Sequence, residues 1–305
     1  MNRFLNSFNF RFKIFIKYLN IIYNFLIPLD NYTISIYEGR FGNNIQQVLN
    51  GVIFSKMNHY NFYSKNHENI EKTESINNKF DNKFRFLKKR SSFFGNPKLE
   101  ISKVLPADFL SSKYYLENAN HLMKGLISEK IKFLDSQQID DDTLVIHIRS
   151  GEIFNGKDKY GEYVQNPLKF YEILIEKFEK ILIVSENSEN PVIDKLLKYN
   201  KVQFQSSTME SDFNTLYSAK NLATSGVGTF GMVAALMSHK LENLYCTDIF
   251  LKDHLNPNMI DKKIVNVYMF KIKNYISIGN WVFNDKNKNL MLSKNVEIKT
   301  PSNYL

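Results

Sequence analysis

The feature that most constrains this chain is a regular alternation of short apolar segments and helical segments over residues 140–247. Short strands that alternate with helices predict a parallel sheet with right-handed crossovers, and continuous apolar strands are typical of a sheet covered on both faces. In such sheets ligands bind beyond the carboxyl ends of the strands, here after residues 148, 185 and 225. The expected strands are 143–148, 181–185, 202–204, 221–225 and 244–247, and the expected helices are 167–179, 191–199, 211–219 and 229–238.

The first half of the chain is less regular. Residues 32–37 (YTISIY) predict a short strand, because β-branched and aromatic residues favour extended backbone, and residues 43–56 place apolar residues at helical spacing. Residues 64–100 are polar and rich in asparagine, which predicts a long loop. Residues 106–139 are expected to be mostly helical, with a boundary between the two halves near 135–142.

The composition indicates a globular chain with an anionic partner. Of the 305 residues, 43% are hydrophobic and 23% are charged, as in proteins with a sizeable core. The net charge of +9 favours a polyanion such as nucleotide phosphates or anionic lipid, whereas no nucleic-acid recognition motif is present. The single Cys246 excludes an internal disulfide and a cysteine-based zinc site and fits a reducing compartment. A buried, inert thiol is expected there.

Two basic segments raise the question of a membrane surface. Residues 3–29 are apolar with four basic side chains, which fits an amphipathic helix on a bilayer or a helix packed on the protein body. Their longest charge-free run, 18–29, is too short for a spanning helix, and no signal cleavage pattern follows it. Residues 79–98 interleave basic side chains with phenylalanines, which fits an anionic surface or a solvated loop.

The first candidate site is residues 147–152 (HIRSGE), at the end of an expected strand. Alternation along a strand places His147 and Arg149 on the same side. A guanidinium is always ionised and binds two phosphate oxygens at once, so Arg149 suits the charge that builds on a leaving diphosphate. The alternatives are an ion pair between Arg149 and Glu152 and a buried core role for His147.

Two glycine-rich segments lie between expected strands and helices. Residues 225–231 (SGVGTFG) let the backbone approach a ligand, and a helix from Thr229 offers free N–H groups and a positive dipole end to a phosphate. Residues 39–44 (GRFGNN) lie at a similar junction and could line a cleft from the opposite side. Neither has the spacing of a dinucleotide fingerprint or a P-loop, and a tight turn explains each equally well.

In this order, the three segments resemble the motifs of fucosyltransferases, the group of the protein O-fucosyltransferases and the α-1,2-fucosyltransferases. Residues 39–44 are similar to their glycine–asparagine motif and 147–152 to their His-x-Arg motif. Asp212 with 228–230 is similar to their third motif, an acidic residue followed by Ser/Thr-Phe. The resemblance extends over about 34–56 and 142–246.

The resemblance implies an α/β fold of the GT-B type, with two Rossmann-like domains facing across a cleft. It also implies an inverting glycosyltransferase that moves fucose from GDP-fucose to a glycan acceptor, without a metal or other cofactor. Separately, the lack of a secretory signal leads us to expect a cytoplasmic location, with peripheral contact at the inner membrane face through 3–29 and 79–98 as the membrane alternative. The expected parts are a basic segment at 1–30, an acceptor-side domain at 31–138, a nucleotide-sugar domain at 139–270 and a tail at 271–305 that packs back.

The same resemblance implies roles for individual residues. Arg149 contacts the donor diphosphate, and Asn43 lies across the cleft near the sugar or the diphosphate. Thr229 and Phe230 line the phosphate and nucleotide pocket. Asp212 positions the nucleoside, and the remaining donor-binding residues are Gly39, Arg40, Gly42, His147 and Gly228.

The sequence offers alternatives for both the catalytic base and the sugar donor. An inverting transfer usually needs a base for the proton of the acceptor hydroxyl. Glu38 is preferred because it adjoins the glycine motif, with Glu152 and Asp108 as alternatives, and a mechanism without a strong base stays open. Ser150 stands where the α-1,2 enzymes tend to have a second arginine, and Glu152 stands where aspartate is usual. Another nucleotide sugar is therefore the alternative donor, and a non-catalytic protein that binds membrane surfaces is the alternative from another class.

Overall fold

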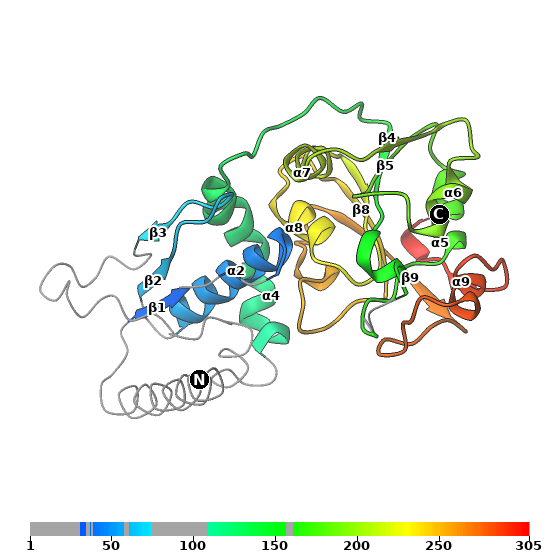
Figure 1. The fold of residues 1–305 in the computed structure, drawn as a ribbon. Coiled ribbons are helices and arrows are strands. Elements are labelled where there is room, and N and C mark those ends of the chain that lie inside the picture. Colours follow the sequence, from blue (N-terminus) through cyan, green and yellow to red (C-terminus); the bar gives the residue numbers. More distant parts are fainter. Residues whose placement is uncertain are drawn as a thin grey trace, which may run out of the picture.

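The computed structural model describes residues 31–34, 37, 39–57, 61–74, 109–156 and 161–304. Expectations for the basic segments 1–30 and 79–98 fall outside these residues, as do those for Glu38 and Asp108. Within the described ranges the chain forms one seven-stranded sheet and one three-stranded sheet, joined through helices (Figure 1).

The large sheet has the order β10-β9-β8-β7-β4-β5-β6. Six neighbouring strands pair in parallel, and β10 alone runs antiparallel, beside β9. The expected parallel α/β sheet is therefore confirmed. Its strands are β4 (Thr143–His147), β5 (Lys180–Val184), β6 (Val202–Gln205), β7 (Asn221–Ala223), β8 (Asn243–Thr247), β9 (Asn266–Lys273) and β10 (Glu297–Lys299).

The strand order reverses beside β4. From β4 the chain builds outward through β5 and β6, then returns to place β7 on the other side of β4 and continues to β8 and β9. The loops after β4 and β7 therefore diverge at their carboxyl ends, which is where open α/β sheets leave a crevice for ligands.

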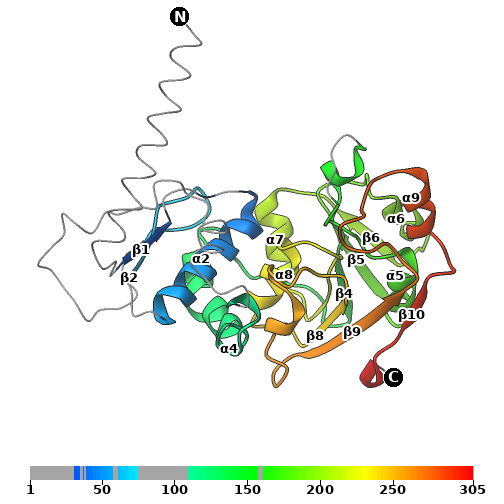
Figure 2. The same ribbon diagram turned by 90° about the horizontal axis from the view of Figure 1, so that it is seen from below.

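Helices cover both faces of this sheet, as Figure 2 shows. Successive residues of β4 point into different cores, because side chains alternate along a strand: Val145 packs with α7, α8 and α2, whereas Leu144 and Ile146 pack with α5 and α6. The covering helices are α5 (Leu168–Ile175), α6 (Pro191–Leu196), α7 (Met209–Tyr217), α8 (Phe230–Met237) and α9 (Asp285–Met291).

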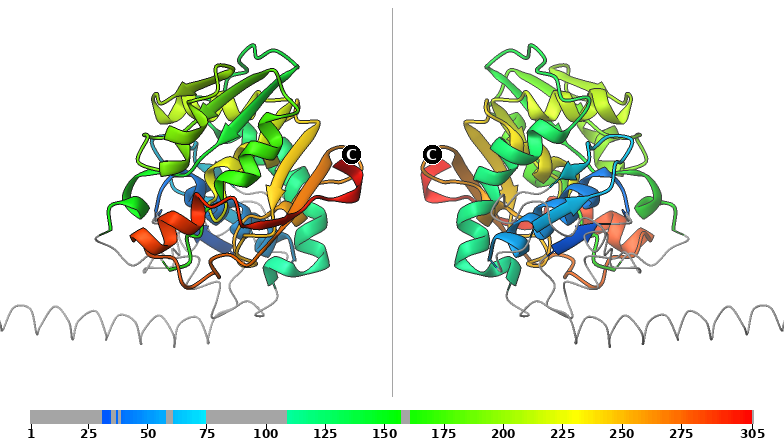
Figure 3. Two further views of the ribbon diagram at one scale, coloured as in Figure 1. Left: turned by 90° about the vertical axis from the view of Figure 1, so that its right-hand side faces the viewer. Right: turned by 90° about the vertical axis from the view of Figure 1, so that its left-hand side faces the viewer.

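The N-terminal part packs on the rest of the chain through α2 (Phe41–Met57), which contacts α8 at one side and the small sheet at the other (Figure 1). Most residues of α2 are buried, so the helix lies inside the molecule between the two sheets. In the small sheet β1 (Asn31–Ile34) pairs in parallel with β2 (Asn61–Ser64), and β2 pairs antiparallel with β3 (Thr73–Glu74). In the right-hand view of Figure 3 the N-terminal part, with α2 and the small sheet, faces the viewer.

The expectation of a mostly helical stretch over 106–139 is only partly correct. Within it α4 (Lys113–Leu122) continues into a π-helical turn at Met123–Ile127 and a 3-10 turn ending at Lys130. Ile131 then bridges to Ile70, and the backbone stays irregular to Asp140. Residues 134–140 therefore lead from this bridge to β4 rather than extend the helix.

Candidate functional site

A cleft of about 720 Å³ opens at the carboxyl ends of β4 and β5. Its walls come from the first turn of α2, the β2–β3 loop, the loops after β4, β5 and β7, and the start of α7. Residues of all three sequence motifs line this cleft. The sequence suggests that the motifs share a site, but it does not give their arrangement. The lining includes the expected residues Gly39, Arg40, Gly42, Asn43, His147, Arg149, Glu152, Asp212, Gly228, Thr229 and Phe230.

Two arginines and two glutamates form one cluster in the cleft wall. Arg149 Nη2 donates a hydrogen bond to Glu152 Oε1, and Arg149 Nη1 lies 3.9 Å from Glu186 Oε1. The ion pair between Arg149 and Glu152, the alternative raised by the sequence, is therefore present. The pair still leaves Arg149 Nε without a hydrogen bond among the described residues. Because Nε and Nη2 together form a guanidinium edge suited to a bidentate partner, one donor of that edge is unused.

Arg40 links this cluster to the N-terminal part of the chain. It lies just before α2, and its Nη2 is 2.5 Å from Glu152 Oε2 while its Nη1 is 2.7 Å from Glu186 Oε2. Burial alone would lower the pKa of the Arg40 guanidinium, but Glu186 and Glu152 outweigh burial and raise its pKa. Arg40 is thus a fixed cation that joins the two walls of the cleft.

The amino ends of α2 and α8 meet at the cleft. Thr229, which precedes α8, donates a hydrogen bond from Oγ1 to Asn43 Oδ1 at 3.0 Å. Gly42 makes this approach possible, because a Cβ there would lie 2.5 Å from Thr229 Oγ1 and 3.0 Å from the Phe230 nitrogen. Helix amino ends carry free N–H groups and partial positive charge, so two of them favour an anion at the same place.

His147 is a buried histidine at the end of β4. Its Nδ1 shares a 3.3 Å hydrogen bond with Ser225 Oγ, and its ring centroid lies 5.5 Å from that of Phe230. Burial, and secondarily the charge of Arg149, lower the pKa of His147 to about 3. His147 is therefore buried, as its core alternative expects, and its ring connects Ser225 after β7 with Phe230 at the start of α8.

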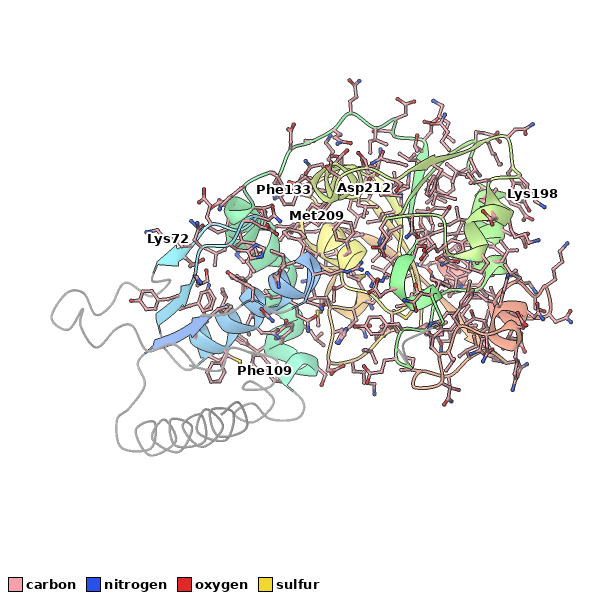
Figure 4. All side chains as sticks on the ribbon, viewed as in Figure 1. Lys72, Phe109, Phe133, Lys198, Met209 and Asp212 are labelled. Carbon is pink, nitrogen blue, oxygen red and sulfur yellow. The ribbon has the colours of Figure 1, made fainter. Side chains whose placement is uncertain are left out.

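The carboxylate of Asp212, on α7, organises the connection from β6. It accepts hydrogen bonds from Gln205 Nε2 at 2.9 Å and from the Ser207 nitrogen at 3.2 Å. Burial raises the pKa of Asp212, and these two bonds oppose the rise. Figure 4 shows Asp212 and Met209 on α7. The helix begins before the expected residue 211, because Thr208 caps it.

The similarity to known proteins is slight. Neither a protein-family model nor a curated protein sequence matches the chain. A crystal structure of POFUT1 in complex with GDP aligns with 68% of this chain and 93% of that chain, at a TM-score of 0.34 and 12% sequence identity. At that TM-score the likeness carries no conclusion about function. The residues of the cleft must carry the functional argument instead.

Several cleft residues were not singled out from the sequence. Glu186 follows β5, and the rule on carboxyl ends had pointed to that loop without naming a side chain. Residues 67–69 of the β2–β3 loop also line the cleft, and they belong to the segment 64–100 that is expected to be a long loop. Met209, Glu210 and His254 also line it. Their contribution depends on contacts between distant segments, for which the sequence carries no local signal.

Two expected absences bear on this site. Within the described ranges no group of three or more His, Cys, Asp or Glu side chains is placed to hold a metal ion. Among the same residues no helix is long and apolar enough to cross a bilayer. Transfer without a metal and contact with a membrane both stay predictions.

Cys246 is buried, and burial raises the pKa of its thiol to about 12, as expected for an inert thiol.

Replacing His147 by asparagine is expected to reduce the loss of stability on acidification. The folded pKa of His147 lies below 6.5, so the unfolded chain takes up a proton that the folded chain excludes, and stability falls as the pH drops below 6.5. At pH ~5 this costs the wild type about 2 kcal/mol. Urea unfolding at pH ~7.5 and ~5 measures the difference.

The asparagine amide can keep the bond to Ser225 without titrating. The exposed histidine His121 supplies the control, because His121→Asn should lose as much stability on acidification as the wild type. If His147→Asn lost as much stability on acidification as the wild type, the buried neutral ring would not be the cause.

Proposed function

We propose that this chain is a glycosyltransferase that binds a nucleotide sugar in the 720 Å³ cleft and releases its nucleoside diphosphate. The observation that carries the proposal is that Arg149 and the amino ends of α2 and α8 line one cleft at the point where the strand order reverses. Segments distant in sequence thus supply a guanidinium and two helix amino ends, the groups that best stabilise a phosphate anion.

Charge on the leaving diphosphate explains why these groups would promote transfer. As the bond from the sugar to the β-phosphate breaks, negative charge grows on the phosphate oxygens, and fixed positive groups stabilise that charge more than the starting state. The unused Nε of Arg149 lies on the edge that could take two phosphate oxygens once Glu152 gives up Nη2. The α8 amino end, with Thr229, would hold the neighbouring phosphate.

The remaining assignments follow the resemblance to fucosyltransferases. We assign Asn43 to the sugar or diphosphate across the cleft, and Asp212 to the nucleoside side. We interpret residues 31–138 as the acceptor-side domain and 139–270 as the nucleotide-sugar domain of a GT-B arrangement. The support for this division is that the cleft is lined from both parts, with α2 and the β2–β3 loop opposite the carboxyl ends of β4 and β5.

The donor sugar is proposed to be fucose from GDP-fucose, transferred with inversion and without a metal to a glycan acceptor. A transferase with another nucleotide sugar is the alternative, because Ser150 and Glu152 depart from the usual fucosyltransferase motif. Ser150 is buried and bonded to Asn187 Oδ1 at 2.5 Å. It therefore shapes the loop and leaves Arg149 and Arg40 as the cleft guanidiniums among the described residues.

A donor screen with purified protein tests the proposal. GDP-fucose, GDP-mannose, UDP-glucose and ADP-glucose are incubated separately, and release of the nucleoside diphosphate is measured. GDP release from GDP-fucose above all others is the expected result. Preferential release from another nucleotide sugar would favour the alternative donor, and release from none of them would contradict the assignment as a transferase.

A further inference from the structure

The cleft holds more negative side chains than diphosphate binding requires. Its described lining includes two guanidiniums, those of Arg40 and Arg149, against five carboxylates. A carboxylate beside a diphosphate site weakens anion binding, because like charges repel. Its presence there therefore suggests a second role. The five are Glu68, Glu152, Glu186, Glu210 and Asp212.

Two of these carboxylates have both oxygens engaged in fixed contacts. Glu152 accepts from Arg149 with Oε1 and from Arg40 with Oε2. Asp212 bonds the Ser207 nitrogen with both oxygens and Gln205 with one of them. The oxygens of both side chains are therefore already used in contacts within the cleft wall.

Glu186 is placed differently. Its Oε2 accepts from Arg40, but Oε1 receives no hydrogen bond among the described residues and lies 3.9 Å from Arg149 Nη1. The side chain is 36% exposed and lines the cleft, where a bound molecule can meet it. The charged groups that face it are Arg40, Arg149 and Glu152.

The loop after β4 leaves room for this carboxylate. Gly151 has a φ of 76°, a conformation that residues with a side chain rarely adopt. A Cβ at Gly151 would also lie 2.5 Å from Glu186 Oε1, so a larger residue would displace the carboxylate. The backbone of Glu186 is held in turn, because its carbonyl accepts a hydrogen bond from Ser206 Oγ at 2.9 Å.

We propose that Glu186 is the catalytic base of the transfer reaction, an inference that rests on the proposed function. Its Oε1 takes the proton of the acceptor hydroxyl, whose oxygen forms the new bond to the anomeric carbon. The bond from that carbon to the β-phosphate oxygen breaks, and its electron pair leaves with the diphosphate beside Arg149. For each sugar transferred, Glu186 becomes protonated and one nucleoside diphosphate is released.

The test compares Glu186→Gln with the wild type in GDP-fucose hydrolysis, in which water is the acceptor. Glutamine can still accept from Arg40, so the fold should survive, but it cannot take a proton. The rate of GDP release should fall about 10²- to 10⁴-fold, with GDP affinity unchanged or higher. Glu297→Gln removes an exposed carboxylate paired with Lys273 on β10 and β9, and should match the wild type.

The pH–rate profile separates catalysis from structure. The wild-type rate should fall toward acid pH, because the base must be ionised, and this acidic limb should disappear in Glu186→Gln. Glu186→Asp should restore part of the rate together with the limb. Hydrolysis by Glu186→Gln at the wild-type rate, or an unchanged acidic limb, would overturn the assignment of Glu186 while leaving the transferase function intact. Failure of the wild type itself to bind GDP, UDP and ADP would instead refute the proposed function.

Discussion

Arg149→Lys is expected to lower the rate of nucleoside diphosphate release by about 10²- to 10³-fold, the usual effect of removing one preorganised charge contact to a developing anion. Lysine keeps the positive charge, but it lacks the planar edge formed by Nε and Nη2 that can bind two phosphate oxygens. It can still pair with Glu152, so the wall of the cleft should persist. Steady-state kinetics with the preferred donor measures the loss.

Thermal unfolding of the same variant shows whether the fold is intact. A melting temperature close to that of the wild type, with a rate reduced by two orders of magnitude, is the predicted combination. Lys180→Arg is the matched control, since Lys180 forms surface ion pairs with Asp140 and Asp142 at the start of β5 and lies outside the cleft lining. A wild-type rate in Arg149→Lys would mean that Arg149 serves only its ion pairs.

Gly42→Ala is expected to destabilise the protein by about 1–3 kcal/mol, the range for overpacking a close contact. The new Cβ would lie 2.5 Å from Thr229 Oγ1 and 3.1 Å from the Thr229 carbonyl carbon, so α2 and α8 must move apart. The bond from Thr229 to Asn43 lies at this contact, and nucleotide affinity should fall with stability. Urea unfolding and GDP titration measure the two effects.

Gly125 provides the opposite case in the same half of the chain. It lies exposed in the helical segment after α4, and a Cβ there would meet no atom within 4 Å. Gly125→Ala should therefore stabilise the protein by up to about 1 kcal/mol, because alanine has the higher helix propensity and the smaller unfolded-state entropy. If Gly42→Ala proved as harmless as Gly125→Ala, the close contact of α2 with α8 would be wrong.

The large sheet could be predicted from sequence because its strands carry a local signal. Continuous apolar runs such as 144–146 and 181–184 are short, and helices with proline or hydroxyl residues at their starts follow the strands. Both sides of β4 are buried, which is why Val145 and its two neighbours read as one apolar run rather than an alternating one. The parallel pairing then follows from the crossovers.

The edge of the sheet carried a weaker signal. Strand β9 mixes lysines with apolar residues because it has one partly exposed face, and β10 is three residues long and pairs antiparallel with it. The small sheet was also missed beyond β1. Its second and third strands have only four and two residues, so neither carries a clear local pattern, and β2 pairs with β1 and β3 across long connections.

The candidate site divides in the same way. His147, Arg149 and Thr229 could be predicted, because each stands at a strand or helix end where ligands bind in parallel sheets. The pairing of Arg40 with Glu152 and Glu186 could not be predicted, since it joins residues more than 100 positions apart. A lone arginine in a sequence shows its charge but not which carboxylates will face it.

Titration calorimetry of the wild-type protein with GDP tests the central claim most directly, with UDP and ADP as comparison nucleotides. The account predicts saturable binding of GDP at one site per chain, weakened at least tenfold in Arg149→Lys and retained in Lys180→Arg. Absence of binding by all three nucleoside diphosphates, or GDP binding that is unchanged in Arg149→Lys, would contradict a diphosphate site between Arg149 and the amino end of α8.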